Sequence, residues 1–458
     1  MSQISAIAKL TIRAGMRQRL FLWIGLLLGS LVFLLPFFIE HDGSAQMYAR
    51  LFITYSMGVC SVFLTLLVLW LSCSSIAQEF EECRIQMLFA KPVAAWQVWV
   101  GKWLGIMFIS FVFLSFSGIA IYGALQWHAR GLAPSESDAM RREVMVAREA
   151  VGEDFSGVES EVDRIYKERI RGQRDTQFDR EFVRRKTEDF VKAKWEVIPA
   201  KHVRTWSLNL NRPAVELQKE TLRIRLRFHA GGPDTSKNYV GVWKVGPPNS
   251  GNVWYHQTEL VADAFHEFEL PDGLVNDSGR IDIEFRNFSD TTLLFPLKDG
   301  LKILYPAGSF AGNLARALGI VFCFNALVAA LGLAASGAFS FSVAAFLVTG
   351  MLIVFSSGNI ISSVVTEGTI GGLDHETGEK AFTTMDWLLV PFFKGVSKLS
   401  GLFDRFSPIQ SLATGRNIGF QNLLHAFLLL VIGFGCLFGC IGVLLLRLRE
   451  PARIQNHS

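Results

Sequence analysis

The clearest candidates for catalytic side chains are three adjacent residues, Asp374-His375-Glu376, which together could move protons or hold a metal ion. Neighbouring side chains on a helix or a strand point in different directions, so this triplet is a weak signal. The sequence contains no phosphate-binding G-x-x-x-x-G-K-[ST] and no G-x-S-x-G, and its cysteines and histidines lack the spacing of a zinc site. We therefore expect no enzymatic activity, no metal and no cofactor in this chain.

Residues 78–92 combine acidic, basic and apolar side chains in a way that suits contact with another protein. The apolar side chains would anchor the partner, the charged ones would orient it at the rim, and Pro92 would end the helix that carries them. The candidate interface residues are Glu79, Phe80, Glu82, Arg84, Met87, Phe89, Lys91 and Pro92. The simpler alternative is a plain helix beside a membrane.

A third group with residue types suited to binding is aromatic. Tyr239, Trp243 and Trp254, together with Tyr255, could line a ligand surface, for example one for carbohydrate. Aromatic side chains on strands mostly serve packing, so a hydrophobic core is the favoured alternative for these residues.

Six apolar blocks in the sequence predict the helices that hold these residues in place. A membrane-crossing helix needs about 20 consecutive apolar residues. Blocks of that kind occur at Leu20–Ile39, Leu51–Ala77, Trp103–Trp127, Ala311–Ala335, Ser340–Val365 and Leu423–Leu446. Hydrophobic residues make up 50% of the chain and charged residues only 19%. We expect a polytopic α-helical membrane protein with six transmembrane helices.

The basic residues at both ends of the chain predict its orientation. Lys9, Arg13 and Arg17 precede the first apolar block, and Arg447 and Arg449 follow the last one. Positive charge marks the cytoplasmic side, so both termini and the loop 78–102 are expected there. The net charge of +4 is too small to indicate a nucleic-acid partner.

Residues 128–300 differ completely in composition from the apolar blocks, which predicts an extracytoplasmic domain inserted between the third and fourth transmembrane helices. Mixed charges with helix-like spacing of apolar residues predict helices over 133–200. Alternation of apolar and charged residues predicts strands over 205–295, as in Leu222, Ile224, Leu226 and Phe228. Frequent turn clusters between them favour a β-sandwich, and the domain is thus predicted to be α+β.

The remaining segments complete the expected organisation. The pattern of residues 1–19 predicts a cytoplasmic amphipathic helix in the membrane plane, with Ile4, Ile7, Ala8, Thr11, Ala14 and Gly15 on one face. The alternative is a basic flank that only sets the orientation of the chain. The membrane sections are 20–127 and 301–447. The outer segment 366–421 has apolar stretches too short to cross, which indicates interfacial or re-entrant helices, and 448–458 is a cytoplasmic tail.

Three stretches carry a resemblance to a known family. They are Ile76-Ala77-Gln78-Glu79-Phe80-Glu81-Glu82, Met87-Leu88-Phe89-Ala90-Lys91-Pro92 and Gln97-Val98-Trp99-Val100-Gly101-Lys102. This order of an acidic stretch, a Lys-Pro turn and a Gly-Lys resembles the ABC-2 type transporter permease family. The similarity covers the membrane sections, and the long insertion at 129–300 departs from the short loop of minimal family members.

The resemblance implies a set of partners and a place in the cell. Two permease subunits, alike or different, would pair in the plasma (inner) membrane of a bacterium. Each would bind a separate ATP-binding cassette subunit through a coupling helix at 79–92, and export would be the direction of transport. ATP would then be hydrolysed in the partner. The alternative function is a membrane-anchored envelope binding or assembly protein whose β-domain recognises a glycan or a protein.

Overall fold

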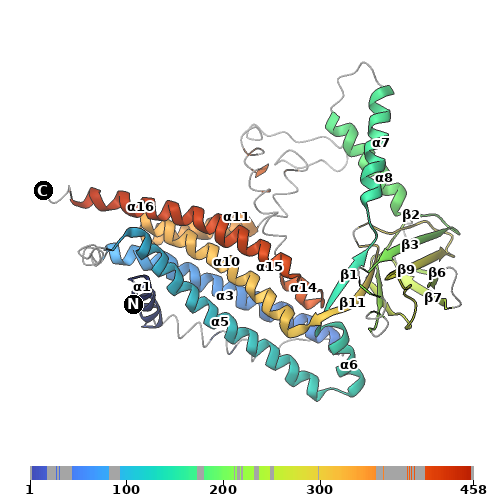
Figure 1. Ribbon diagram of the computed structural model, residues 1–458, viewed down its shortest axis with the longest axis horizontal. Helices are drawn as coiled ribbons and strands as arrows, with labels where there is room; N and C mark the ends of the chain where they lie inside the picture. Colours follow the sequence, from blue (N-terminus) through green and yellow to red (C-terminus); the bar gives the residue numbers. More distant parts are fainter. Residues whose placement is uncertain are drawn as a thin grey trace. The chain divides into compact units, whose positions relative to one another are not determined.

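The computed structural model describes residues 3–17, 44–81, 93–172, 180–210, 220–231, 237–247, 252–297, 299–356 and 408–454, with a few single residues between these ranges. The chain divides into two compact units (Figure 1). The helical unit comprises Met1–Ala147 and Ser309–Ser458, and the inserted unit comprises Arg148–Gly308. Each unit is described by itself.

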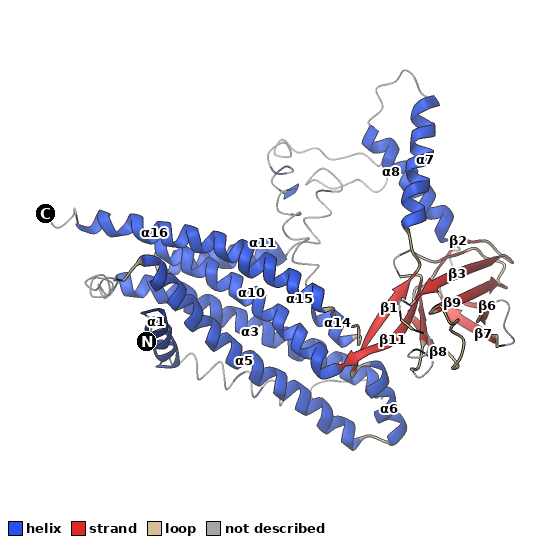
Figure 2. Cartoon of the chain, viewed as in Figure 1, coloured by secondary structure: helices blue, strands red, loops and turns tan. Residues whose placement is uncertain are grey.

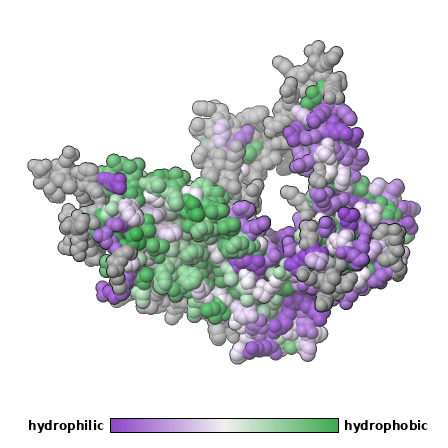
Figure 3. All heavy atoms as spheres, viewed as in Figure 1, coloured by the Kyte–Doolittle hydropathy of each residue, from purple (hydrophilic) through white to green (hydrophobic). Residues whose placement is uncertain are grey.

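Among the described residues of the helical unit, four helices are long and apolar enough to cross a membrane: Ala45–Phe80, Ala95–Gly131, Phe310–Ala338 and Phe420–Leu448. They belong to α3 (Ala45–Glu81), α5 (Ala95–Gly131), α10 (Phe310–Ala338) and the continuous run of α15 (Phe420–Ala426), η1 (Phe427–Gly435) and α16 (Cys436–Ile454). Figure 3 shows apolar residues over the visible face of these helices. The chain therefore has the character of a mostly helical membrane protein.

Four of the six predicted spans correspond to these helices. The first predicted span, 20–39, lies outside the described residues except for two single positions. The fifth is described only as α11 (Phe341–Ser356), a shorter apolar helix. Two helices extend beyond the predicted spans, since α3 covers Ala45–Glu81 and α5 covers Ala95–Gly131, so the predicted loop 78–102 is helical at both of its ends.

Helix α10 lies at the centre of the helical unit, in contact with α3, α5, α11, α14 (Pro408–Ala413), α15, η1 and α16. Small residues allow this close packing, because a side chain at Gly332 would lie 2.0 Å from Ser72 Oγ on α3. Asn325 is fully buried and joins three helices: Thr65 Oγ1 donates to its Oδ1 (3.0 Å), and its Nδ2 donates to Ser110 Oγ (3.2 Å).

Helix α1 (Gln3–Arg17) forms where an amphipathic helix was predicted. Its predicted apolar face packs against α5, where a side chain at Gly101 would lie 2.8 Å from Ile7 Cβ and one at Gly105 would lie 2.8 Å from Thr11 Cβ. The face that was expected to lie against lipid is thus occupied by protein, at least from Ile4 to Thr11. Beyond α5, the short helix α6 (Pro134–Glu143) packs beside α3.

The described residues of the inserted unit form three sheets and a pair of helices (Figure 2). The first sheet has the order β1 (Val146–Gly152), β11 (Leu301–Ser309), β4 (Arg223–Leu226) and β8 (His266–Glu269). The second has the order β3 (Val203–Asn209), β9 (Arg280–Asn287), β6 (Asn238–Val245) and β7 (Trp254–Val261). A small third sheet joins β2 (Val197–Ile198), β10 (Leu293–Leu294) and β5 (His229–Ala230).

Alternation in the sequence correctly predicts which side chains enter the core of this unit. Ile224 and Leu226 of β4, and Ile281, Ile283 and Phe285 of β9, are buried in one shared hydrophobic cluster. The helices α7 (Ser156–Gly172) and α8 (Arg180–Glu196) pack on each other through Val158, Val162 and Val191.

The structure has strands in two places where the sequence did not predict them. Residues 133–200, predicted as helical, include strands β1 and β2, and residues 301–309, predicted as the start of the second membrane section, form strand β11. Leu301–Leu304 of β11 pair with β4, and β11 continues to Ser309, directly before α10.

Candidate functional site

A buried ion pair joins the end of α3 to the beginning of α5. The ammonium Nζ of Lys102 lies 2.7 Å from Glu79 Oε1, and it donates hydrogen bonds to the backbone oxygen (2.6 Å) and the hydroxyl (3.1 Å) of Ser75. Lys102 is only 3% exposed, whereas the side chain of Glu79 is 28% exposed. The other carboxylate oxygen of Glu79 has no hydrogen-bond partner among the described residues.

The local sequence explains how these two side chains meet. Helix α5 begins after Ala94, whose N–H donates to Gln97 Oε1 (3.1 Å), and this cap fixes the first turn. Ser75 and Glu79 are four residues apart and therefore lie on one face of α3. Three donor positions on the ammonium then meet three oxygens on that face, which compensates for removing the charge from water.

Trp99, three residues before Lys102, packs against the last helix. Side chains at Gly439 and Gly442 of α16 would lie 3.1 Å and 2.6 Å from the Trp99 ring, so the two glycines form the notch that receives it. The Trp99 ring stacks on Trp103 with 6.5 Å between ring centroids. Trp103 in turn donates from Nε1 to the backbone oxygen of Ala326 on α10 (3.0 Å).

Trp99, Gly101, Lys102 and Trp103 form what we term the α5 junction. Consecutive residues on a helix project about 100° apart. The junction accordingly contacts α16 through Trp99, α1 through Gly101, α3 through Lys102 and α10 through Trp103. The start of α5 is therefore in contact with four neighbouring helices.

The α5 junction lies at the same end of the helical unit as the basic termini. Helix α1, with Lys9 and Arg13 exposed, packs on Gly101, and α16 continues past Gly442 to the exposed Arg447. The end of α3 and the start of α5, between which residues 82–92 lie in the sequence, are at this end too (Figure 1). One end of the unit thus combines positive charge with the helix ends that flank the predicted interface.

The predicted interface residues are only partly within the described chain. Glu79 is there and carries the ion pair. Phe80 is buried at 2% exposure in the core, and its role as an apolar anchor for a partner stays a prediction. The other six, Glu82, Arg84, Met87, Phe89, Lys91 and Pro92, lie outside the described residues.

Sequence reasoning missed Lys102, Trp99 and Ser75 as site residues. The available signal was a lysine placed directly after a glycine at the start of an apolar block, since a charge there needs a partner. Its partner could not be assigned because the distance from residue 79 to residue 102 depends on how α3 and α5 pair.

The aromatic residues of the inserted unit separate into two groups. Trp243 is fully buried and donates from Nε1 to Thr258 Oγ1 (3.0 Å), and Tyr239 is also buried, so both belong to the core and not to a ligand surface. Trp254 is partly exposed and stacks on His256, with 4.8 Å between centroids and 12° between planes. It lines an open hollow of about 420 Å³ with Thr221, Glu269 and Asp272.

Among the described residues, no group of three or more His, Cys, Asp or Glu side chains is arranged to hold a metal ion. The triplet Asp374-His375-Glu376 lies outside the described part of the chain. No family model matches the sequence, and neither the curated proteins nor the solved structures include a match.

Proposed function

We propose that this chain is the membrane-spanning permease subunit of an ATP-binding cassette transporter of the ABC-2 type. A separate ATP-binding subunit would dock on residues 79–92 and supply the energy. The α5 junction is the observation that supports this proposal most strongly, because it links the end of that segment to α1, α3, α10 and α16. The resemblance of residues 76–102 to the family adds to it.

The proposed mechanism rests on the contacts of the two helix ends that flank residues 82–92. The first of these ends is tied to α5 by the Glu79–Lys102 ion pair, and the second leads through Trp99 into the glycine notch of α16. A push on 82–92 by a partner that changes shape on binding and hydrolysing ATP would move α3 and α5 together. Because α10 contacts both of them, the motion would reach the centre of the unit.

The proposal includes the finer architecture. The chain would cross the membrane six times with both termini in the cytoplasm, and residues 20–39 and 340–365 would form the first and fifth spans. The two four-stranded sheets would form a β-sandwich on the outer side, which is supported by the contact of Trp243 on β6 with Phe268 on β8 at 5.6 Å between centroids. A second permease subunit, alike or different, would complete an exporter in the plasma (inner) membrane of a bacterium.

Affinity purification of the full chain in mild detergent tests this proposal. We expect an ATP-binding protein with a G-x-x-x-x-G-K-[ST] motif to co-purify in stoichiometric amount. Reversing the charges of Glu82 and Arg84 should lower its recovery at least fivefold, whereas reversing the exposed Arg164 on α7 should not. Glu79 is left in place because it pairs with Lys102. Unchanged recovery after the double reversal would contradict the docking role of 79–92.

A second candidate function is favoured by the hollow beside Trp254. The hollow suits a sugar ring. The C–H face of the ring could stack on Trp254, and the sugar hydroxyls could donate hydrogen bonds to the carboxylates of Glu269 and Asp272, beside the Thr221 hydroxyl. The chain would then be a membrane-anchored protein that binds an envelope glycan.

Tryptophan fluorescence of the full chain, titrated with neutral and amino-sugar oligosaccharides, tests this function. W254A should abolish the response and Y255A should preserve it, since Tyr255 is 64% exposed and points to the other face of β7.

A further inference from the structure

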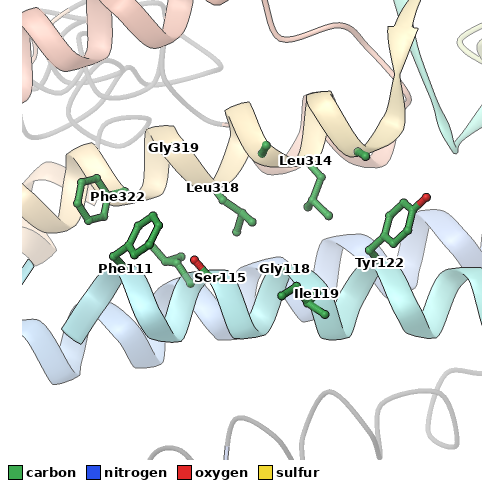
Figure 4. A pocket seen from close by; sticks show the side chains of 12 residues that line it. Phe111, Ser115, Gly118, Ile119, Tyr122, Leu314, Leu318, Gly319 and Phe322 are labelled. Carbon is green, nitrogen blue, oxygen red and sulfur yellow. The ribbon is translucent and has the colours of Figure 1, made fainter. Parts of the chain in front are cut away.

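An apolar groove of about 490 Å³ runs between α5 and α10 (Figure 4). Small side chains along its walls leave this space open. They are Ser115 and Gly118 on α5, and Ala311, Ala315 and Gly319 on α10. Only Leu318 reaches across to Gly118, where a side chain would lie 2.4 Å from Leu318 Cδ1. All of these residues belong to the helical unit.

Aromatic pairs close both ends of the groove, which gives it a defined length. Phe111 meets Phe322 edge-on with 6.1 Å between centroids at one end, and Tyr122 stacks on Phe310 with 6.3 Å between centroids at the other. From Phe111 to Tyr122 is eleven residue steps along α5, or about 16 Å at 1.5 Å per residue. Half of the roughly 30 Å hydrocarbon core of a bilayer has nearly the same thickness. The groove thus has the length of an acyl chain in one leaflet.

The Tyr122 end of the groove carries polar and positive groups. Gln126 Nε2 donates to the Tyr122 hydroxyl (3.2 Å), and Arg141 on α6 donates to Gln126 Oε1 (3.1 Å). Arg130 continues the same face of α5, four residues after Gln126, and is exposed. Among the described residues no carboxylate forms an ion pair with Arg130 or Arg141, although Asp138 lies one turn before Arg141.

We propose that this groove binds one acyl chain of an anionic phospholipid, with the lipid phosphate held by Arg141 and the Tyr122 hydroxyl. The length and the apolar lining of the groove favour an acyl chain. The guanidinium groups of Arg130 and Arg141, which form no ion pair among the described residues, favour an anionic headgroup over a zwitterionic one. The site is separate from the α5 junction and does not depend on the proposed transport function. Its position beside α10 makes the lipid a stabilising component of the helical unit.

Native mass spectrometry of the full chain in detergent tests the proposal, with phosphatidylglycerol and phosphatidylcholine added in equal amounts. We expect one tightly retained phosphatidylglycerol per chain in preference to phosphatidylcholine. R141Q should reduce that preference about fivefold. The matched control R13Q removes an equal charge from the exposed face of α1, near the other end of the unit, and should leave it unchanged.

A groove-filling variant keeps the test independent of folding. Ala315 is exposed on the groove wall, so A315F fills the space without entering the core and should remove retention of both lipids while the thermal transition persists. The proposal is overturned if A315F retains phosphatidylglycerol as the wild type does, or if R141Q and R13Q have equal effects. Efficient cross-linking of two chains through I119C would also overturn it, because a second copy would then cover the groove.

Discussion

Lys102 carries a full charge at a position where almost no water reaches it. A lysine in an apolar helix is tolerated when it is paired or when its stem leads the charge to the membrane surface. Lys102 uses pairing, since Glu79 and Ser75 supply three oxygens within 3.1 Å. The two partners are unequally exposed, and this asymmetry makes their separate roles measurable.

Substituting the two partners of this pair one at a time should have unequal effects on stability. E79Q leaves the buried ammonium without its counter-charge and should cost about 3 kcal/mol of unfolding free energy. K102M should cost less, because the Glu79 side chain is already 28% exposed and can turn further to water. Thermal unfolding of the purified chain checks this order, and K102M/E79Q should recover part of the loss. Equal losses that add in the double variant would show that the pair is not coupled.

Tyr305 on β11 offers a pH-dependent test in the inserted unit. Burial, together with the carboxylate of Glu149, raises the pKa of Tyr305 to about 12, and its hydroxyl donates to the Leu210 backbone oxygen (3.3 Å). Because the folded pKa lies above the ordinary value of 10, the contribution of Tyr305 to stability is complete below pH 10 and is lost as the pH rises to 12. In an absorbance titration of the full chain, the tyrosinate signal that appears near pH 12 should therefore be missing from the Y305F variant. A difference near pH 10 instead would show that Tyr305 is exposed.

At the scale of elements, small residues let α10 pack closely against its neighbours. Gly332 is the closest approach, facing Ser72 of α3. Asn325 adds directional hydrogen bonds to α3 and α5, which a purely apolar interface would lack. Small residues thus bring the helices together, and one buried amide fixes their register.

The variant G332A should destabilise the helical unit by about 1–3 kcal/mol, because its methyl group would overlap with Ser72. G350A on α11 is the matched control, since no atom lies within 4 Å of the added methyl group there. Thermal unfolding in one detergent measures both variants. Equal transition temperatures for the two would contradict the close packing of α3 on α10.

Much of this element-level organisation follows from the sequence alone. Apolar length predicted α3, α5, α10 and the last helix, and two-residue alternation predicted β4 and β9 with their buried faces. Both signals are local. The α5 junction and the Trp254 hollow were not predictable in the same way, because they depend on which helices and strands meet. Trp243 and Trp254 look alike in the sequence, yet only the packing of β6 between β7 and β9 shows that Trp243 is the buried one.

At the scale of the whole molecule, the proposed function requires the α5 junction and the inserted unit to lie on opposite sides of a membrane. Their surfaces differ in kind, since the helical unit exposes large apolar side chains such as Phe116 and Phe346, whereas the inserted unit has charged strands such as β4. The proposed transmission of force from 79–92 requires this separation.

Cysteine labelling with a membrane-impermeant maleimide tests the orientation in a variant that lacks the six native cysteines. Tyr255 is exposed on β7 and Arg13 is exposed on α1. We expect Y255C to react in intact cells and R13C to react only after permeabilisation. Reaction of both positions in intact cells would contradict the orientation.

Site-specific photo-cross-linking in living cells can show whether an ATP-binding subunit docks on residues 79–92. A photoreactive amino acid replaces Phe89, and the same photoreactive amino acid at exposed Tyr255 serves as the control. Position 89 should form an adduct with a protein that carries a G-x-x-x-x-G-K-[ST] motif, and position 255 should not. The absence of any ATP-binding protein from the adducts at position 89, with efficient cross-linking to other proteins there, would contradict this docking.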